Sequence, residues 1–251
     1  MHDKPVALVT GANRGIGLQI AKDLTARGLT VLIGSRDLER GQVAATEVGP
    51  AAVALQFDVT DETSIAATAE RIRQEFGRLD VLIQNAAIAR ASDRTQTGEE
   101  LAQANRPSVV PLDEMRAVWD TNVFGVLAVY QAMVPILRDT PDARIVNISS
   151  GMGSLTLNSD PTFALRSLYD ATYAASKTAL NALTLAMAIE LEADGISVHA
   201  VSPGHTRTRL TGFAGTDSVE EGAAEAVRVA LPGSGLPTGS FTHAAVGVVP
   251  W

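Results

Sequence analysis

The fold is decided by the stretch from Val6 to Gly17, which reads VALVTGANRGIG. Its first five residues are apolar or β-branched and predict a short buried strand. Glycines then stand at positions 11, 15 and 17, and an amphipathic helical pattern continues to Arg27, where Gly28 ends it. Such a loop lets the backbone turn tightly and approach a pyrophosphate, whose charge is stabilised by the helix N-terminus. The stretch therefore predicts a dinucleotide-binding strand–helix unit.

The same alternation of strands and helices continues along the chain. Continuous apolar runs predict further strands over 30–34, 51–58, 79–84, 144–149, 197–202 and 240–243. Helical patterns cover 37–48, 61–76, 113–138, 173–193 and 218–231. Apolar strands separated by helices are typical of a buried parallel sheet, so the chain is predicted to be an α/β protein. Its 251 residues suit one domain spanning 1–251.

Composition restricts the classes of function. A formal net charge of −8 argues against nucleic acid and anionic membranes as partners, and no uninterrupted apolar run approaches the ~18 residues of a membrane span. The absence of cysteine excludes disulfides and thiolate catalysis. The four histidines lack the spacing of metal ligands, so no metal site is expected. No signal-peptide pattern is visible, and the expected compartment is the cytoplasm.

The residues after the second predicted strand indicate which dinucleotide binds. An acidic side chain at that point would bind the ribose 2′-hydroxyl of NAD, whereas this chain has Ser35 and Arg36. The Arg36 guanidinium can pair with a 2′-phosphate, and Arg14 and Arg40 can reinforce it. Asp37 is placed to cap the next helix. These residues favour NADP(H) over NAD(H), although a solvated helix face explains Arg40 equally well.

Tyr173 and Lys177 lie four residues apart at the start of the helix predicted over 173–193. Positions i and i+4 share a helix face, so the phenol and the ammonium point into the same space. A lysine cation beside a phenol favours the phenolate and lowers the phenol's pKa. Tyr173 is therefore a candidate proton donor and acceptor. Taken alone, the pair is equally compatible with a surface tyrosine and a solvated lysine.

In their order along the chain, these motifs resemble those of the short-chain dehydrogenase/reductase family, and the resemblance covers nearly all of the sequence. The family's Thr-Gly-xxx-Gly-Ile-Gly loop matches Thr10 to Gly17, and its Tyr-xxx-Lys motif matches Tyr173 and Lys177. The resemblance implies a single-domain Rossmann fold. Its doubly wound, mostly parallel sheet would have about seven strands in the order 3-2-1-4-5-6-7, with helices on both faces.

The resemblance also implies roles for individual residues. The implied catalytic residues are Asn122, Ser150, Tyr173 and Lys177, with Ser150 chosen over its neighbour Ser149. The implied cofactor contacts are Gly11, Asn13, Arg14, Gly15, Ile16, Gly17, Arg36, Asp58, Val59, Asn85, Ala86, Tyr173, Lys177, Pro203, Gly204 and Thr206, with Thr208 as an alternative to Thr206. The family's Asn-Asn-Ala-Gly motif is altered here to Gln84-Asn85-Ala86-Ala87. Arg14 and Arg36 together are similar to the pair in NADPH-preferring, carbonyl reductase-like members.

The implied activity is reversible reduction of a ketone or aldehyde by hydride transfer from NADPH, with Tyr173 as general acid and base. The expected partner is a small carbonyl or alcohol substrate. The alternative is a regulatory or non-catalytic NADP-binding protein with the same fold. A homodimer or homotetramer is expected from the family, with a monomer also open.

Two segments are longer than the family pattern. Asn85 and Asn122 are 37 residues apart, and the excess falls in the polar stretch 90–112, which is predicted to be a long loop or a weak helix. Ser150 and Tyr173 are 23 residues apart. Segments 151–172 and 205–217 are expected to shape the substrate site, since they adjoin the implied catalytic residues. Packing of 151–172 onto its own domain is an equally good interpretation.

Overall fold

A single sheet forms the centre of the molecule, for which the computed structural model describes residues 4–91 and 97–251. Within them the strand order is β3-β2-β1-β4-β5-β6-β7-β8. Pairing is parallel from β3 to β7 and antiparallel between β7 and β8. The strands are β1 (Val6–Thr10), β2 (Thr30–Ser35), β3 (Ala52–Gln56), β4 (Val81–Gln84), β5 (Arg144–Ile148), β6 (Ser197–Ser202), β7 (Phe241–His243) and β8 (Gly247–Val248). The predicted order is confirmed, and β8 is an edge strand that the sequence pattern did not predict.

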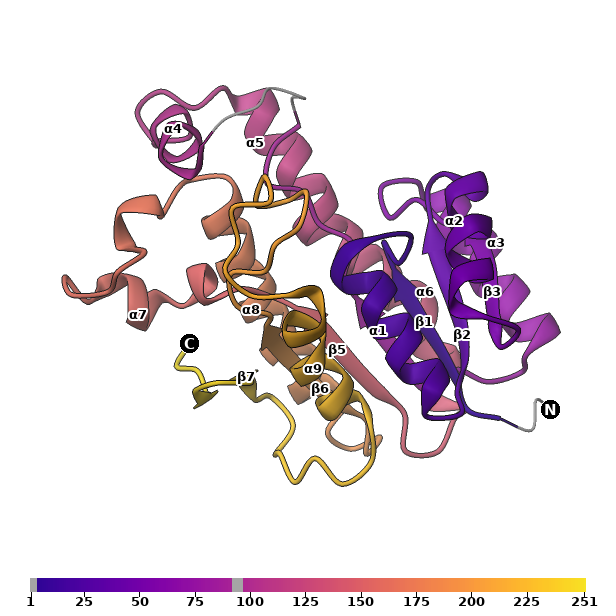
Figure 1. The fold of residues 1–251 in the computed structure, drawn as a ribbon. Coiled ribbons are helices and arrows are strands. Elements are labelled where there is room, and N and C mark those ends of the chain that lie inside the picture. Colours follow the sequence, from indigo (N-terminus) through magenta and orange to yellow (C-terminus); the bar gives the residue numbers. More distant parts are fainter. Residues whose placement is uncertain (1–3, 92–96) are drawn as a thin grey trace.

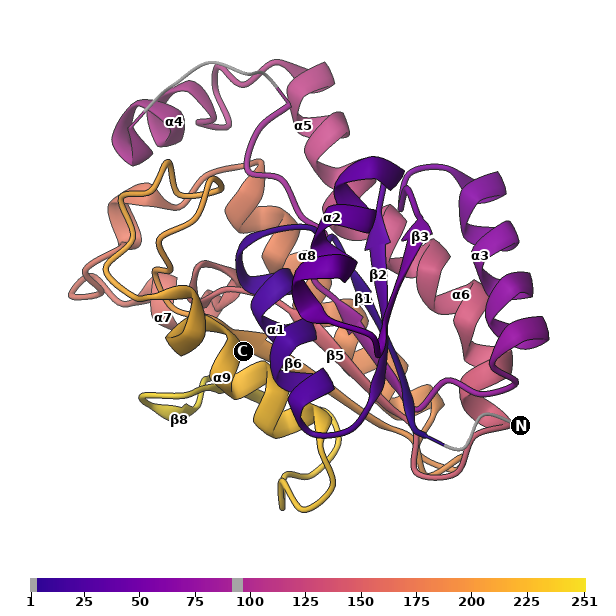
Figure 2. The same ribbon diagram turned by 45° about the vertical axis from the view of Figure 1, so that its right-hand side comes forward.

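Helices cover both faces of this sheet (Figures 1 and 2). One face is packed by α1 (Gly15–Ala26), α2 (Leu38–Val48) and α9 (Val219–Ala230). The other face is packed by α3 (Glu62–Glu75), α6 (Gly125–Arg138) and α8 (Tyr173–Glu190). Both sides of the central strands are therefore removed from water, which is why those strands are continuously apolar in sequence.

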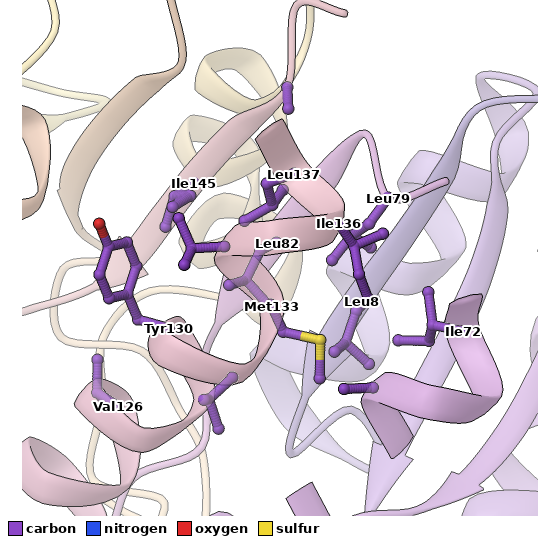
Figure 3. Close-up of a cluster of buried hydrophobic side chains, with 14 of the residues drawn as sticks. Leu8, Ile72, Leu79, Leu82, Val126, Tyr130, Met133, Ile136, Leu137 and Ile145 are labelled. Carbon is purple, nitrogen blue, oxygen red and sulfur yellow. The ribbon is translucent and has the colours of Figure 1, made fainter. Parts of the chain in front are cut away.

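The longest helical segment is the main core helix. It runs from α5 (Leu112–Trp119) through a π-helical turn (Asp120–Phe124) into α6. Its length and composition would allow it to cross a membrane, but half of its apolar window is buried inside the protein. Figure 3 shows this core, where Tyr130, Met133 and Leu137 of α6 pack with Leu8 and Leu82 of the sheet. The apolar face of the helix is therefore explained by packing against the sheet.

The two long segments contain more helix than their sequences predict. Segment 90–112 includes α4 (Gly98–Ala104), which starts with a capping box between Thr97 and Glu100. Segment 151–172 contains a 3₁₀ turn (Gly151–Gly153), α7 (Leu155–Ser159) and a second 3₁₀ turn (Arg166–Leu168). In both ribbon views α4, α7 and the 205–217 loop lie towards one end of the sheet (Figures 1 and 2).

His199 lies in the middle of β6 and is fully buried. Within the described part of the chain, neither of its ring nitrogens has a hydrogen-bond partner. Burial, followed by the positive charges of Arg144 and Arg228, lowers the pKa of His199 to about 4. The imidazole is therefore a neutral group of the core.

Burial of a neutral His199 predicts that stability falls in acid. The unfolded histidine takes up a proton near pH 6.5, whereas the folded one stays neutral to about pH 4, so protonation favours the unfolded chain between these values. Going from about pH 7.5 to about pH 5 should lower the free energy of unfolding by about 2 kcal/mol through this group. Urea unfolding of the wild type and of His199→Leu at both pH values measures this change in the free energy of unfolding. The variant should lose less stability on acidification, and equal losses in the two proteins would contradict the assignment.

Candidate active site

The implied site residues meet at the carboxyl edge of the parallel sheet. The glycine loop follows β1, Asn85 follows β4, Ser150 follows β5 and Pro203 follows β6. Parallel strands present their carboxyl ends at the same edge, and ligands of open α/β sheets bind in the crevice outside it. Residues far apart in sequence are brought together here by the strand order.

The glycine loop fits the pyrophosphate of a dinucleotide. Gly15 begins α1 with φ +55°, in the left-handed region that glycine adopts without strain. The preceding Arg14 makes no side-chain capping bond, and the first turn of α1 contains no acidic residue. The N–H groups at the start of this helix therefore remain available to a phosphate.

Asn85 and Thr10 hold the glycine loop in place through hydrogen bonds. The Asn85 side-chain amide donates to the carbonyls of Thr10 at 2.9 Å and Gly11 at 3.1 Å. The Thr10 hydroxyl accepts from the backbone N–H groups of Asn85 at 3.0 Å and Ala86 at 2.9 Å. In this structure Asn85 thus holds the protein's own loop, and any contact of Asn85 and Ala86 with the cofactor stays a prediction.

Positive charge gathers beside the glycine loop. Burial lowers the pKa of Arg14, and the charges of Arg209, Arg36 and Arg40 lower it further. Arg40 is also paired with Asp37 at 3.1 Å, and Asp37 caps α2 as expected. Arg14 and Arg36 therefore lie close enough for their charges to interact, and their joint contact with one anion stays a prediction. Arg209 joins them from the 205–217 loop, a contribution that no local sequence motif indicates.

An open cleft adjoins these arginines. It has a volume of about 340 Å³, and its lining includes Asn13 and Arg14 from the glycine loop together with Glu39, Arg40 and Val43 from α2. At the neighbouring strand end, Asp58 accepts hydrogen bonds from the N–H and hydroxyl of Thr60 at 2.9 and 2.7 Å. Asp58 and Val59 follow β3 after Phe57, at the sheet edge, and their contact with the cofactor stays a prediction.

The two serines after β5 have different environments. Ser149 is buried, and its hydroxyl donates to Asn181 of α8 at 2.5 Å. Ser150 caps the 3₁₀ turn by accepting from the Met152 N–H at 3.2 Å, and its hydroxyl is near enough to Tyr173 to lower the pKa of the phenol. Ser149 is thus bound to Asn181, whereas Ser150 adjoins the tyrosine, and the catalytic role of Ser150 stays a prediction.

Tyr173 and Lys177 occupy the first two turns of α8. The Lys177 amine lies 5.7 Å from the centroid of the Tyr173 ring and donates to the Ile148 carbonyl at 2.7 Å. Burial lowers the pKa of Lys177 to about 7. The amine can therefore gain or lose a proton near neutral pH, which an exposed lysine cannot.

The expectation that Lys177 lowers the pKa of Tyr173 is wrong for this arrangement. Burial raises the pKa of the phenol to about 12; the nearby Ser150 hydroxyl lowers it, and the charge of Asp170 raises it. The physical reason is that the amine is itself buried with a lowered pKa and bonds to Ile148, so it supplies little positive charge to the phenol. Tyr173 is consequently protonated at neutral pH.

Asn122 lies in the π-helical turn between α5 and α6 and is fully buried. Its side chain accepts from the Ile88 N–H at 2.9 Å and donates to the Ile88 carbonyl at 2.8 Å and to the Ser176 hydroxyl at 3.0 Å. It therefore joins the end of β4 to the helix that carries Tyr173 and Lys177. Such π-helical turns are frequent at functional sites, and the helical sequence pattern gave no sign of this one.

The 205–217 loop lies beside the glycine loop, where its Thr208 adjoins Gly15. Gly204 has φ +78°, and Thr206 is buried with its hydroxyl donating to the Pro203 carbonyl at 2.9 Å. The Thr206 side chain therefore stabilises the base of the loop. Thr208 is the alternative for a cofactor contact, since its methyl lies 3.5 Å from where a Cβ on Gly15 would stand.

The arrangement has a glycine loop suited to a dinucleotide and two neighbouring hydroxyls, those of Ser150 and Tyr173, beside it. A pair of donors at one oxygen suits a group on which negative charge develops. Among the described residues, no cluster of three or more histidine, aspartate or glutamate side chains is placed to hold a metal ion.

Known proteins share this architecture. The chain is 31% identical over 299 aligned positions to the (-)-isopiperitenone reductase of Mentha piperita, covering 94% of this chain and 95% of that one. It resembles the solved structure of salutaridine reductase from Papaver somniferum with a TM-score of 0.79 and 27% identity, covering 95% and 99% of the two chains. A 3-ketoacyl-(acyl-carrier-protein) reductase from Brucella melitensis, solved in complex with NADH, has a TM-score of 0.79 and 26% identity, covering 96% of each chain.

The family model described as short chain dehydrogenase matches residues 5–218, which include every implied catalytic residue and the whole cofactor edge. The glycine loop, the Tyr173–Lys177 pair and this match agree, and the chain belongs to the short-chain dehydrogenase family.

Proposed function

We propose that this protein is an NADPH-dependent reductase of a ketone or aldehyde, working reversibly on the corresponding alcohol. The gathering of Ser150, Tyr173 and Lys177 at one place carries this proposal: the buried Lys177 amine lies 5.7 Å from the centroid of the Tyr173 ring, and the Ser150 hydroxyl is near enough to Tyr173 to lower its pKa. Relatives whose names identify them as reductases or dehydrogenases of small molecules support it.

A bound nicotinamide supplies a hydride to the substrate carbon, or accepts one from it. Tyr173 donates a proton to the carbonyl oxygen as negative charge builds there, and Ser150 holds the same oxygen by a hydrogen bond. Because the pKa of Tyr173 is raised to about 12, the phenol enters the reaction protonated. That protonation state favours reduction, in which the tyrosine acts first as an acid.

Lys177 and Asn122 support proton movement behind Tyr173. Lys177 would bind the ribose hydroxyls beside the nicotinamide, and its pKa of about 7 lets it return a proton towards the tyrosine at neutral pH. Asn122, hydrogen-bonded to Ile88 and Ser176, holds the helices around this amine in register and would support a water-linked path to it.

Arg14 and Arg36 would hold the 2′-phosphate of NADP(H). Burial, followed by the charges of Arg209, Arg36 and Arg40, lowers the pKa of Arg14, and an anion bound between Arg14 and Arg36 would relieve the repulsion between these charges. Asp37, which would otherwise compete for a ribose hydroxyl, is engaged in capping α2 and in pairing with Arg40.

We further propose that segments 151–172 and 205–217 shape the substrate site within the single domain 1–251. Segment 151–172 runs from Ser150 to Tyr173, so both of its ends are fixed at the reacting groups. The chain end also holds it, since the Thr156 N–H and hydroxyl donate to the Trp251 carbonyl at 3.0 and 2.6 Å. Packing and substrate shaping therefore operate together in this segment.

Replacing the proposed acid tests the activity. Tyr173→Phe should reduce NADPH-dependent turnover of a ketone or aldehyde panel at least about a hundredfold, because the proton donor is lost, while NADPH still binds. Loss of NADPH absorbance reports turnover, and fluorescence titration reports binding. The matched control is Tyr169→Phe. It removes a hydroxyl that is hydrogen-bonded at 3.1 Å to Thr178 of α8, and it should retain activity.

Retained turnover in Tyr173→Phe would contradict the acid assignment. Wild-type NADPH binding with no turnover of any substrate would favour the non-catalytic alternative.

Reversing the charge at Arg36 tests the cofactor assignment. Arg36→Asp should weaken NADPH binding about tenfold or more, because a charge-assisted contact to the 2′-phosphate is lost, and should leave NADH binding equal or stronger. Isothermal titration with both cofactors measures the ratio. Arg71→Asp makes the same charge change on α3, across the sheet, where Arg71 pairs with Glu75 at 2.9 Å. The control should keep the wild-type ratio, and an unchanged ratio in Arg36→Asp would contradict the proposed role.

A further inference from the structure

A buried polar junction joins the two long segments immediately before Tyr173. It consists of Asn105, which follows α4, and Asp170 and Thr172, which precede α8. Their exposed fractions are 2%, 5% and 0%. Buried polar side chains are costly unless they are hydrogen-bonded, so the contacts within this junction define what it does.

Hydrogen bonds run through the junction from one segment to the other. The Asn105 side-chain amide donates to the Thr172 hydroxyl at 2.7 Å, and the Asn105 carbonyl accepts from the Ala171 N–H at 3.1 Å. The Thr172 hydroxyl in turn donates to the Asp170 carboxylate at 3.2 Å. Segment 97–105 is thereby attached to the residues that lead into the catalytic helix.

The Asp170 carboxylate also caps that helix. One of its oxygens accepts from the N–H groups of Thr172 and Ala174, each at 3.0 Å. Thr172, at the cap position itself, makes no side-chain capping bond, and the first turn of α8 contains no acidic residue. Asp170, two residues before the cap position, therefore caps α8 in place of Thr172. Tyr173 lies in sequence between the two residues whose N–H groups bind the Asp170 carboxylate.

We propose that Asp170 is a positioning residue for Tyr173: its buried carboxylate fixes the first turn of α8, links it through Thr172 to Asn105, and opposes formation of the Tyr173 phenolate. This inference rests on the proposed role of Tyr173 as proton donor. A structural cap alone would fix the first turn of α8 and link it to Asn105. Opposition to the Tyr173 phenolate is what distinguishes a positioning residue from such a cap.

The charges around Tyr173 agree with the third role. A negative charge near a phenol disfavours the phenolate, and the charge of Asp170 acts on Tyr173 in that direction. The Lys177 amine also faces the ring, 5.7 Å from its centroid. Charged side chains on the neighbouring elements bond elsewhere: Glu100 to Thr97, Glu114 to Ala91, and Arg166 to Asn158.

The chain contains a matched control for this arrangement. Asp160, in the same segment, accepts from both the N–H and the hydroxyl of Thr162 at 2.8 Å, as Asp170 does from Thr172. Asp160 is exposed and does not cap α8. Changing each aspartate to asparagine keeps an oxygen acceptor for the turn and removes the charge.

The experiment follows ionisation of Tyr173 in the complex with NADP⁺, by NMR of isotope-labelled tyrosine assigned with Tyr173→Phe. Asp170→Asn should move the Tyr173 titration about one pH unit lower, and Asp160→Asn should leave it in place. Hydrogen exchange at Ala174 should stay protected in Asp170→Asn and speed up in Asp170→Ala, which loses the cap. If Asp170→Ala does not fold, the two asparagine variants still decide whether Asp170 acts on Tyr173 or is only a structural cap.

An unmoved titration in Asp170→Asn, equal to that in Asp160→Asn, would overturn the proposal and leave a structural cap. The titration needs no turnover, so it is distinguishable from failure of the proposed function. That failure would appear as activity retained in Tyr173→Phe, whatever Asp170 does.

Discussion

The close approach of three chain segments at Gly17 is the constraint on which the cofactor edge depends. A Cβ on Gly17 would lie 2.7 Å from the Gly11 carbonyl oxygen and closer still to the Asn85 side-chain amide, so only glycine fits there. The same amide donates to the carbonyls of Thr10 and Gly11. The end of β1, the start of α1 and the end of β4 therefore form one rigid unit, and the anion-binding N–H groups of α1 have a fixed position.

A second close approach fixes the reacting groups. A Cβ on Gly153 would lie 2.8 Å from the Lys177 backbone, so the turn after Ser150 packs directly on α8. Asn181 strengthens this contact, because it accepts from Ser149 and donates to the Gly153 carbonyl at 3.1 Å. Ser150 and Tyr173 thus belong to two elements that cannot shift independently, which is the preorganisation that a proton-transfer site requires.

Regular elements were predictable where the sequence repeats a strong local pattern. The strands β1 to β7 contain continuous apolar runs, and the helices show a clear apolar period. Both kinds of element were therefore predicted, with ends that differ from the observed ones by at most about three residues. The edge strand β8 was missed because its two residues are exposed and carry no apolar run. Helix α4 was left open as a loop or weak helix, although Thr97 and Glu100 have the spacing of a capping box. The π-helical turn at Asn122 was missed because it leaves the residue pattern of the helix unchanged.

The sequence by itself determined the strands and helices and the residue types of the site, because glycine spacing, helical periodicity and the Ser, Tyr and Lys motifs are local; through its resemblance to a family it also implied the strand order and the choice of Ser150. Only the tertiary structure decided that the Ser149 hydroxyl bonds to Asn181, that the Thr206 hydroxyl is used inside its own loop, and that the charge of Arg209 acts on Arg14. It also decided the protonation of Tyr173, where the sequence predicted the opposite direction. The reason is physical: a pKa and a hydrogen-bond partner depend on burial and on neighbours distant in sequence, and packing of the whole chain sets both.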